Sequence, residues 1–243
     1  MQCSSLRQTF LRVVILATKQ DGAMVDTKTH LKFSDGALES MCHSALETYL
    51  YGDGHETKSQ VEVNGYLWGW RKASNDMQFI FVDRVSPSFS SKKHQNWVQP
   101  NQKAVELQMA FMDRWAPEMS FLGDFHSHPY DNLQTVNKFR GYHFSDGDFG
   151  YLRKDEFLWQ RTEGNPLIVV MTICKLAKVH DSEGQMISQN VWRWDIGEFR
   201  FWLNVAVGYM QDGRRAITGN THSSVFLDLN SRFFNFSGDK LGT

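Results

Sequence analysis

Hydrophobic residues recur along this chain with two periods, and the longer period predicts helices. Apolar residues that recur every three or four positions can be buried on one face of a helix. Ser34 or Asp35 offers an N-cap to the first such segment, and Pro117 ends the second. The second segment carries one apolar stripe, formed by Ala104, Leu107, Phe111 and Trp115. The helices expected on this basis cover residues 35–49, 102–115 and 145–160.

The shorter period, in which apolar and polar residues alternate, predicts strands. Within residues 61–70, Gly65 and Gly69 remove side chains where another element can approach closely. One face of this strand would carry Val61, Val63 and Leu67 with the two glycines. The other face would carry Glu62, Asn64, Tyr66 and Trp68. Residues 167–176 are almost continuously apolar, as in a strand covered on both faces. Further strands are expected at residues 11–17, 77–85, 119–128, 191–196 and 199–209, with two short ones within 225–236.

The order of these elements predicts an α/β (α+β) fold, in which helices flank a mixed, mostly antiparallel sheet. The length of 243 residues suits one large domain. We expect residues 1–180 to form the main domain. Residues 181–243 would add a strand-rich C-terminal extension to the same domain.

Composition restricts the environment and the partners of the protein. A formal net charge of −1 argues against recognition of nucleic acid or of an anionic membrane surface by overall charge. The apolar stretch at residues 10–17 is too short to cross a membrane. Cys3, Cys42 and Cys174 are too few and too scattered for a disulfide framework or a thiolate zinc cluster. These features favour a cytoplasmic protein.

The candidate chemistry begins in the segment from Gly123 to Pro129, which contains His126 and His128. Residues two positions apart on a strand point the same way, so both imidazoles can bind one metal ion. Two histidines are half of a ligand set, and a third ligand must come from elsewhere in the chain.

Asp148 is the candidate third ligand. Ser145 and Asp148 also have the spacing of an N-cap serine and an acid three positions later, which satisfy the amides at a helix start. Both roles are compatible, because the first helical turn can bring Asp148 to the end of the histidine strand. Three protein ligands with an open fourth position are typical of a catalytic zinc ion, whereas structural zinc sites have four protein ligands.

Glu62 is the candidate base, because a hydrolytic zinc site needs a group that accepts a proton from water. It lies on the polar face of its expected strand, among β-branched and aromatic neighbours. The alternative is a solvated glutamate on an edge strand, and the spacing alone does not separate the two.

Together these motifs resemble the JAMM signature of the MPN (JAB-type) metalloproteases. In chain order, the motifs that carry the resemblance are Glu62-x-x-Gly65-x-Leu67-x-Gly69, His126-x-His128-Pro129 and Ser145-x-x-Asp148. The resemblance covers roughly residues 30–180. The chain departs from the family in the 16 residues from Pro129 to Phe144, a longer interval than the family usually has.

The resemblance implies an MPN/JAB-like catalytic domain with zinc bound by His126, His128 and Asp148. Glu62 would be the general acid/base, and Ser145 would donate a hydrogen bond to the developing oxyanion. Members of the family cut the isopeptide or peptide bond after the tail of ubiquitin or a ubiquitin-like protein. The residues covered resemble compact bacterial members more than eukaryotic regulatory subunits. Some of these bacterial members accompany ubiquitin-like conjugation enzymes, so E1-like and E2-like proteins are candidate partners.

Two other functions remain open from the sequence. One is a non-catalytic MPN scaffold for protein partners, and the other is a zinc hydrolase of small peptide conjugates. A zinc deaminase is disfavoured because the chain lacks the H-x-E and C-x-x-C motifs of that class.

The long interval between the second histidine and the serine predicts a flap that packs on an extended substrate. Its ends are fixed beside the expected metal. It carries apolar or aromatic residues at Tyr130, Leu133, Val136, Phe139, Tyr142 and Phe144. The alternative is a surface segment whose aromatic residues fold back on the domain.

Overall fold

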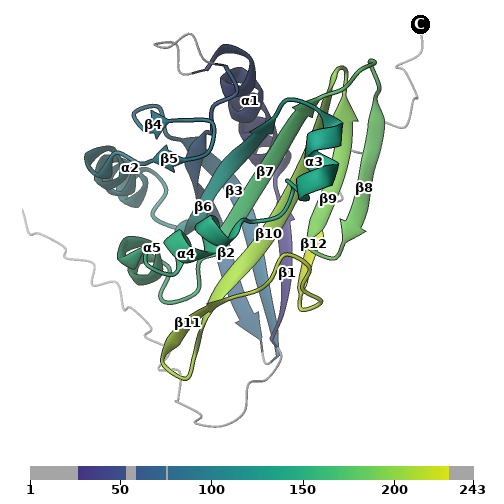
Figure 1. Ribbon diagram of the computed structural model, residues 1–243. Helices are drawn as coiled ribbons and strands as arrows, with labels where there is room; N and C mark the ends of the chain where they lie inside the picture. Colours follow the sequence, from purple (N-terminus) through teal and green to yellow (C-terminus); the bar gives the residue numbers. More distant parts are fainter. Residues whose placement is uncertain (1–26, 53–58, 75, 230–243) are drawn as a thin grey trace, which may run out of the picture.

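The computed structural model describes residues 27–52, 59–74 and 76–229, which form a mixed sheet of ten strands with helices on its faces (Figure 1). Among the described strands, three neighbouring pairs are parallel and the other pairs are antiparallel, as the predicted fold class requires. The strand expected at residues 11–17 and the second one within 225–236 lie outside the described residues. In pairing order the strands are β12 (Val225–Asp228), β1 (Lys28–Phe33), β3 (Met77–Pro87), β2 (Asn64–Ser74), β6 (Ser120–Tyr130), β7 (Leu167–Lys175), β10 (Phe199–Gln211), β9 (Val191–Ile196) and β8 (Ser182–Ser188), with β11 (Arg214–Ile217) beside β10.

The larger core lies on the face of the sheet that α1 (Asp35–Tyr51) covers. Ser34 is the N-cap of this helix, as predicted, and its side chain accepts a hydrogen bond from the Ala37 amide. Leu38 and Met41 of the helix pack with strand residues such as Leu67, and all three are fully buried. Because β7 is buried on both faces, the prediction of a doubly covered strand is confirmed.

The opposite face is covered by α2 (Gln102–Trp115), α4 (Asp146–Leu152) and α5 (Glu156–Arg161). The predicted apolar stripe of α2 does not face the sheet, because Leu107, Phe111 and Trp115 are exposed. Instead, Val105, Met109 and Met112 are buried against Tyr66 and Trp68 of β2. The helix has two apolar stripes, and the sheet contacts the one that periodicity did not select.

The single helix expected over residues 145–160 was wrong, because the structure has two short helices there. The helical segment is interrupted at Asp155, whose side chain accepts a hydrogen bond from the Leu158 amide and caps the start of α5. The break turns the chain so that Leu152 of α4 and Leu158 of α5 are buried in one cluster on the sheet.

Strand β2 starts at Asn64, three residues later than predicted, and continues to Ser74. The glycines of this strand allow close approach, as predicted. A β-carbon on Gly65 would lie 2.4 Å from the Phe125 ring, and one on Gly69 would lie 1.9 Å from the Phe81 carbonyl oxygen. The chain therefore needs glycine at both positions to keep β2 between its neighbouring strands.

The strands after residue 180 join the same sheet as those before it. Strand β10 pairs with β7 over nine residue pairs, from Phe199↔Lys175 to Val207↔Leu167, and β12 pairs with β1. Among the helices that the structure describes, none is both long enough and apolar enough to cross a membrane.

Candidate metal centre

Strand β6 presents His126 and His128 on one face, as the spacing predicted. Between them, Ser127 points to the other face and is fully buried. The Ser127 hydroxyl oxygen accepts a hydrogen bond from the Val63 amide at 2.9 Å, and the Ser127 amide donates to the Val63 carbonyl oxygen at 2.8 Å. These two bonds fix the segment that carries Glu62 against the strand that carries both histidines.

Asp148 reaches the histidines from the first turn of α4. Ser145 is the N-cap of this helix, and its hydroxyl oxygen accepts a hydrogen bond from the Asp148 amide at 3.1 Å. The Asp148 carboxylate accepts one in return from the Ser145 amide at 2.6 Å, which completes a capping box. The same carboxylate also faces both imidazoles, so the capping and ligand roles hold together.

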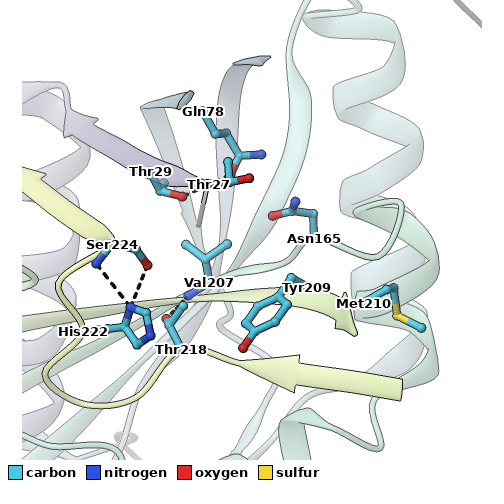
Figure 2. Close-up of a pocket in the computed structure, with 10 residues that line it drawn as sticks. All are labelled: Thr27, Thr29, Gln78, Asn165, Val207, Tyr209, Met210, Thr218, His222 and Ser224. Carbon is cyan, nitrogen blue, oxygen red and sulfur yellow. Dashed lines mark hydrogen bonds between the residues drawn. The ribbon is translucent and has the colours of Figure 1, made fainter. Parts of the chain in front are cut away.

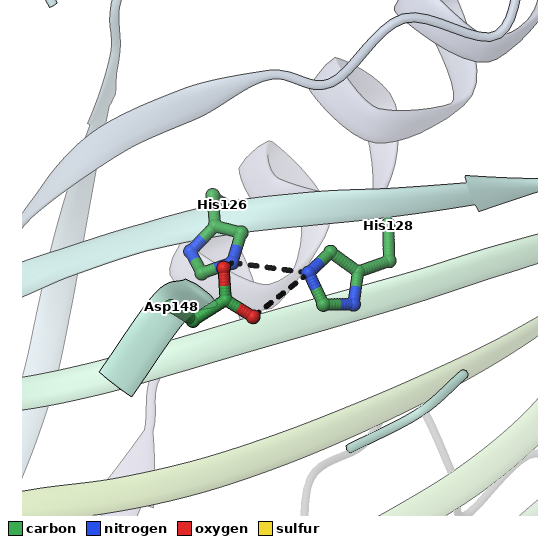
Figure 3. A group of neighbouring side chains, drawn as sticks. All are labelled: His126, His128 and Asp148. Atoms are coloured by element: carbon green, nitrogen blue, oxygen red, sulfur yellow. Dashed lines mark hydrogen bonds and ion pairs between the residues drawn. The ribbon is translucent and has the colours of Figure 1, made fainter. Parts of the chain in front are cut away.

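The three side chains converge on one point (Figure 3). His126 Nε2 lies 3.2 Å from His128 Nε2, and the two nitrogens lie 3.3 and 3.4 Å from the carboxylate oxygens of Asp148. Two ligands about 2.1 Å from a tetrahedral metal ion are themselves about 3.4 Å apart. The two imidazole nitrogens lie close to this separation, and each lies at about this distance from a different oxygen of Asp148. One ligand atom from each residue lies within 4.8 Å of the others, so the group can hold a metal ion.

The charges at this point depend on one another. Burial opposes ionisation of Asp148, but its contacts with His126 and His128 outweigh burial and hold the pKa of this carboxyl far below its ordinary value. Burial lowers the pKa of His126. Burial also acts to lower the pKa of His128, but the contact with Asp148 outweighs it and the pKa is raised. Asp148 is thus ionised at neutral pH, as a metal ligand must be.

The tautomer of His128 is set by the segment that follows β6. His128 Nδ1 lies 3.2 Å from the carbonyl oxygen of Gly141. A carbonyl oxygen can only accept, so Nδ1 carries the hydrogen and Nε2 keeps its lone pair for a metal. Thr172 holds the same carbonyl oxygen through its hydroxyl group at 2.9 Å.

Glu62 lies beside the metal ligands and is only 7 % exposed, unlike a solvated edge-strand glutamate. Its amide donates to the His94 carbonyl oxygen at 2.8 Å. Burial raises the pKa of Glu62 to about 8, with a lowering contribution from His128 and a further raising one from Asp148. Because His128 and Asp148 both affect the pKa of Glu62, its carboxyl group lies close enough to interact electrostatically with two of the three candidate ligands.

A cavity of about 300 Å³ opens in front of these side chains. Its walls come from β6, from α4 and from the segment that contains the short hairpin β4 (Lys92–Lys93) and β5 (Val98–Gln99). Its lining residues are Glu62, Asn64, Asn96, Trp97, Val98, Pro100, Asp124, Phe125, His126, Ser145, Gly147, Asp148, Tyr151 and Leu152. The predicted base, two of the predicted ligands and the predicted oxyanion donor thus all line one cavity.

The sequence analysis missed two residues that line this cavity, Trp97 and Asp124. The ring of Trp97 stacks on that of His94, with the centroids 5.4 Å apart. Asp124 also lines the cavity, and burial, with the carboxylates of Asp155 and Asp148, raises its pKa to about 8. Asp124 could have been found, because it lies two residues before His126 on the same face of a strand. No feature of the nearby sequence indicates where the hairpin that contains His94 and Trp97 lies in the fold.

The predicted flap is not a free loop. It contains α3 (Leu133–Phe139), in which Val136 is fully buried, and Phe144 is buried beneath α4. Tyr130, Leu133 and Tyr142 pack against a cluster of Val136, Cys174 and Trp202, and among the six apolar residues of the segment Phe139 is the exposed one. The alternative, in which the aromatic residues fold back on the domain, describes this segment better, and through Gly141 it supports His128.

We expect Gly141→Ala to lower the affinity for added zinc about 10- to 100-fold, although it removes no ligand. A β-carbon at this position would lie 2.4 Å from the Tyr130 ring and would displace the carbonyl oxygen that orients His128. Competition with a chromophoric chelator measures the affinity. Gly150→Ala on α4 is the matched control, because its β-carbon would meet no described heavy atom within 4 Å beyond its own turn. Wild-type affinity in Gly141→Ala would show that the segment does not support the site.

A second cavity, of about 260 Å³, lies near the start of β1 and the link between β11 and β12 (Figure 2). It is lined by polar and apolar side chains, among them Val207 and Met210, and the hydroxyl oxygen of Ser224 lies 2.6 Å from Nδ1 of His222. Within the described residues, the group of three metal-ligating side chains is at the first cavity. The candidate functional site is therefore the one around His126, His128 and Asp148.

Comparison of the chain with protein-family models and with curated proteins gives no match. The functional assignment thus depends on the geometry of the site and on the motifs in the sequence.

Proposed function

We propose that this protein is a zinc-dependent isopeptidase or peptidase of the JAMM type. The observation that carries the proposal is the convergence of three side chains that can hold a metal ion, next to the buried carboxyl group of Glu62 at one cavity. A non-catalytic scaffold would have no need for this combination of ligands, base and open cavity. Two imidazoles and one carboxylate with an open fourth position form a ligand set that suits zinc.

A zinc ion bound there would supply Lewis acidity for a substrate carbonyl group and lower the pKa of a water molecule to about 7. Residues of the chain would carry out the proton transfers. Glu62 accepts the proton of the attacking water and later delivers it to the leaving amine. Burial raises the pKa of Glu62 above its ordinary value, which makes the carboxylate a stronger proton acceptor than an exposed glutamate.

Ser145 is placed to donate a hydrogen bond. Its hydroxyl oxygen already accepts a bond from the Asp148 amide, so its own hydrogen is left to point into the cavity that it lines. A donor at this position would stabilise negative charge on the substrate oxygen as the tetrahedral state forms. The capping box and the catalytic role therefore use different parts of the same hydroxyl group.

We propose the tail of a ubiquitin-like protein, free or in a conjugate, as the substrate, with E1-like and E2-like proteins as pathway partners. An extended tail can enter a cavity that is open between a two-stranded hairpin and a helix, and can pair with strand backbone as it does so. Hydrolysis of small peptide conjugates is the second candidate, because a cavity of about 300 Å³ also accommodates a short peptide.

The test is a panel of ubiquitin-like fusions and short peptides that carry the same tails, incubated with zinc-loaded protein. We expect hydrolysis after the tail, loss of this hydrolysis when a chelator removes the metal, and recovery when zinc is added back. Faster cleavage of the short peptides than of the fusions would favour the second candidate. No hydrolysis of any member by fully zinc-loaded protein would contradict the proposal.

We expect Ser145→Ala to lower kcat about 10²- to 10³-fold, the usual effect of losing one oxyanion donor. The substitution also removes half of the capping box, which stabilises the start of α4 by about 1 kcal/mol. Thermal unfolding and kcat should be measured on the same samples. Ser40→Ala is the control, because it removes a serine hydroxyl group from α1, away from the cavity. An unchanged kcat in Ser145→Ala would remove Ser145 from the mechanism.

A further inference from the structure

Asp124 lines the cavity of the candidate metal centre but does not belong to the group of three side chains that can hold a metal ion. Residues 124, 126 and 128 share one face of β6, so the Asp124 side chain points the same way as both histidines. Within the described part of the chain, its Oδ1 atom is shielded from solvent and has no hydrogen-bond partner. A buried carboxyl oxygen without a partner is unfavourable, and most such atoms in proteins are satisfied. Asp124 therefore offers an acceptor to whatever enters the cavity.

The other walls of the cavity favour a cation. The described residues that line it include the acids Glu62, Asp124 and Asp148, but no Lys or Arg. Two aromatic side chains remain open to a ligand, since Trp97 is 48 % exposed and Tyr151 is 55 % exposed. The face of an aromatic ring attracts a positively charged group, and Arg most often. Glu62 and Asp148 are committed to the metal centre, which leaves Asp124 as the acid available to a substrate.

We propose that Asp124 selects substrates with a positively charged side chain, of the arginine or lysine class, next to the bond that is cut. The inference rests on the proposed function, because it assigns a substrate preference to the same site. The cation would favour the ionised form of the Asp124 carboxyl group and pair with it, while the rings of Trp97 and Tyr151 flank its aliphatic stem and charged end. Asp124 is thus a specificity-determining residue, and the proton transfers remain with Glu62.

The test measures peptide binding to zinc-loaded Glu62→Gln protein by fluorescence anisotropy, so that turnover does not consume the probe. The probes are fluorescein-labelled hexapeptides with one arginine moved along a glycine and alanine background, each with a counterpart that has citrulline in its place. Citrulline keeps the shape of arginine and removes the charge. At one position we expect the arginine peptide to bind about 10-fold or more tightly than its counterpart. Asp124→Asn should bring this ratio close to one.

Asp146→Asn is the matched control, because Asp146 is exposed on the first turn of α4 and does not line the cavity. It should keep the arginine preference. Equal binding of arginine and citrulline peptides at every position, no binding of any peptide, or an unchanged preference in folded Asp124→Asn protein would overturn the proposal. The first two outcomes need no variant of Asp124, so the test holds even if Asp124→Asn does not fold.

The test separates this inference from the proposed function. An arginine preference in binding, together with no hydrolysis by the unsubstituted protein, would overturn the proposed function and leave the role of Asp124 intact. Hydrolysis of peptides without any arginine preference would overturn only the role of Asp124.

Discussion

Glu62→Gln protein is expected to bind zinc like the unsubstituted protein and to lose about 10²- to 10⁴-fold in kcat. Glutamine has nearly the same shape as glutamate, but its amide can neither accept the proton of water nor return it to the leaving amine. The fold should survive, because the hydrogen bond from residue 62 to His94 is made by the backbone amide and not by the side chain. The measurement is kcat on the most active tail substrate, with zinc content determined on the same sample.

Glu39→Gln is the matched control for this substitution. Glu39 is exposed on α1, so the same chemical change there should leave kcat and zinc content unchanged. Activity of Glu62→Gln within a few-fold of the unsubstituted protein would remove Glu62 from the mechanism. Loss of zinc from this variant would instead show that residue 62 supports the metal and does not transfer protons.

The double substitution His126→Ala and His128→Ala is expected to remove zinc binding and all metal-dependent activity. Two of three ligand atoms are lost, and a single carboxylate does not hold zinc in competition with a chelator. Elemental analysis of protein purified with and without added zinc measures the effect. The ratio of zinc to chain should fall from about one to near zero.

His43→Ala is the control for this loss, because His43 lies exposed on α1 and should leave the ratio at one. Unchanged zinc in the double variant would place the metal elsewhere in the chain. The double variant should still fold in the absence of metal, since the core clusters do not include either histidine.

The three candidate metal ligands were predictable from sequence because two local rules place them. Alternation on a strand puts His126 and His128 side by side, and the helix-start spacing of Ser145 and Asp148 fixes the direction of the Asp148 carboxylate. The remaining step, which brings α4 next to β6, needs the tertiary structure. That step was inferred from the combination of motifs, and the structure brings the three side chains together.

The features that were missed depend on long-range contacts or on competing local patterns. Both stripes of α2 are apolar, so periodicity did not reveal that Met109, and not Phe111, faces the sheet. Strand β8 lies at the edge of the sheet and is largely exposed, so it has no apolar alternation to detect. The position of Trp97 beside the cavity depends on how the hairpin folds over Glu62, and nothing near Trp97 in the sequence indicates it.

The most direct test of the account is anomalous X-ray diffraction at the zinc absorption edge, from crystals of zinc-loaded protein. We predict one anomalous peak per chain, about 2.0 to 2.2 Å from Nε2 of His126, Nε2 of His128 and a carboxylate oxygen of Asp148. The fourth coordination position should face the cavity that Glu62 and Ser145 line. A peak elsewhere, a fourth protein ligand that closes the site, or no peak at full zinc loading would contradict the account.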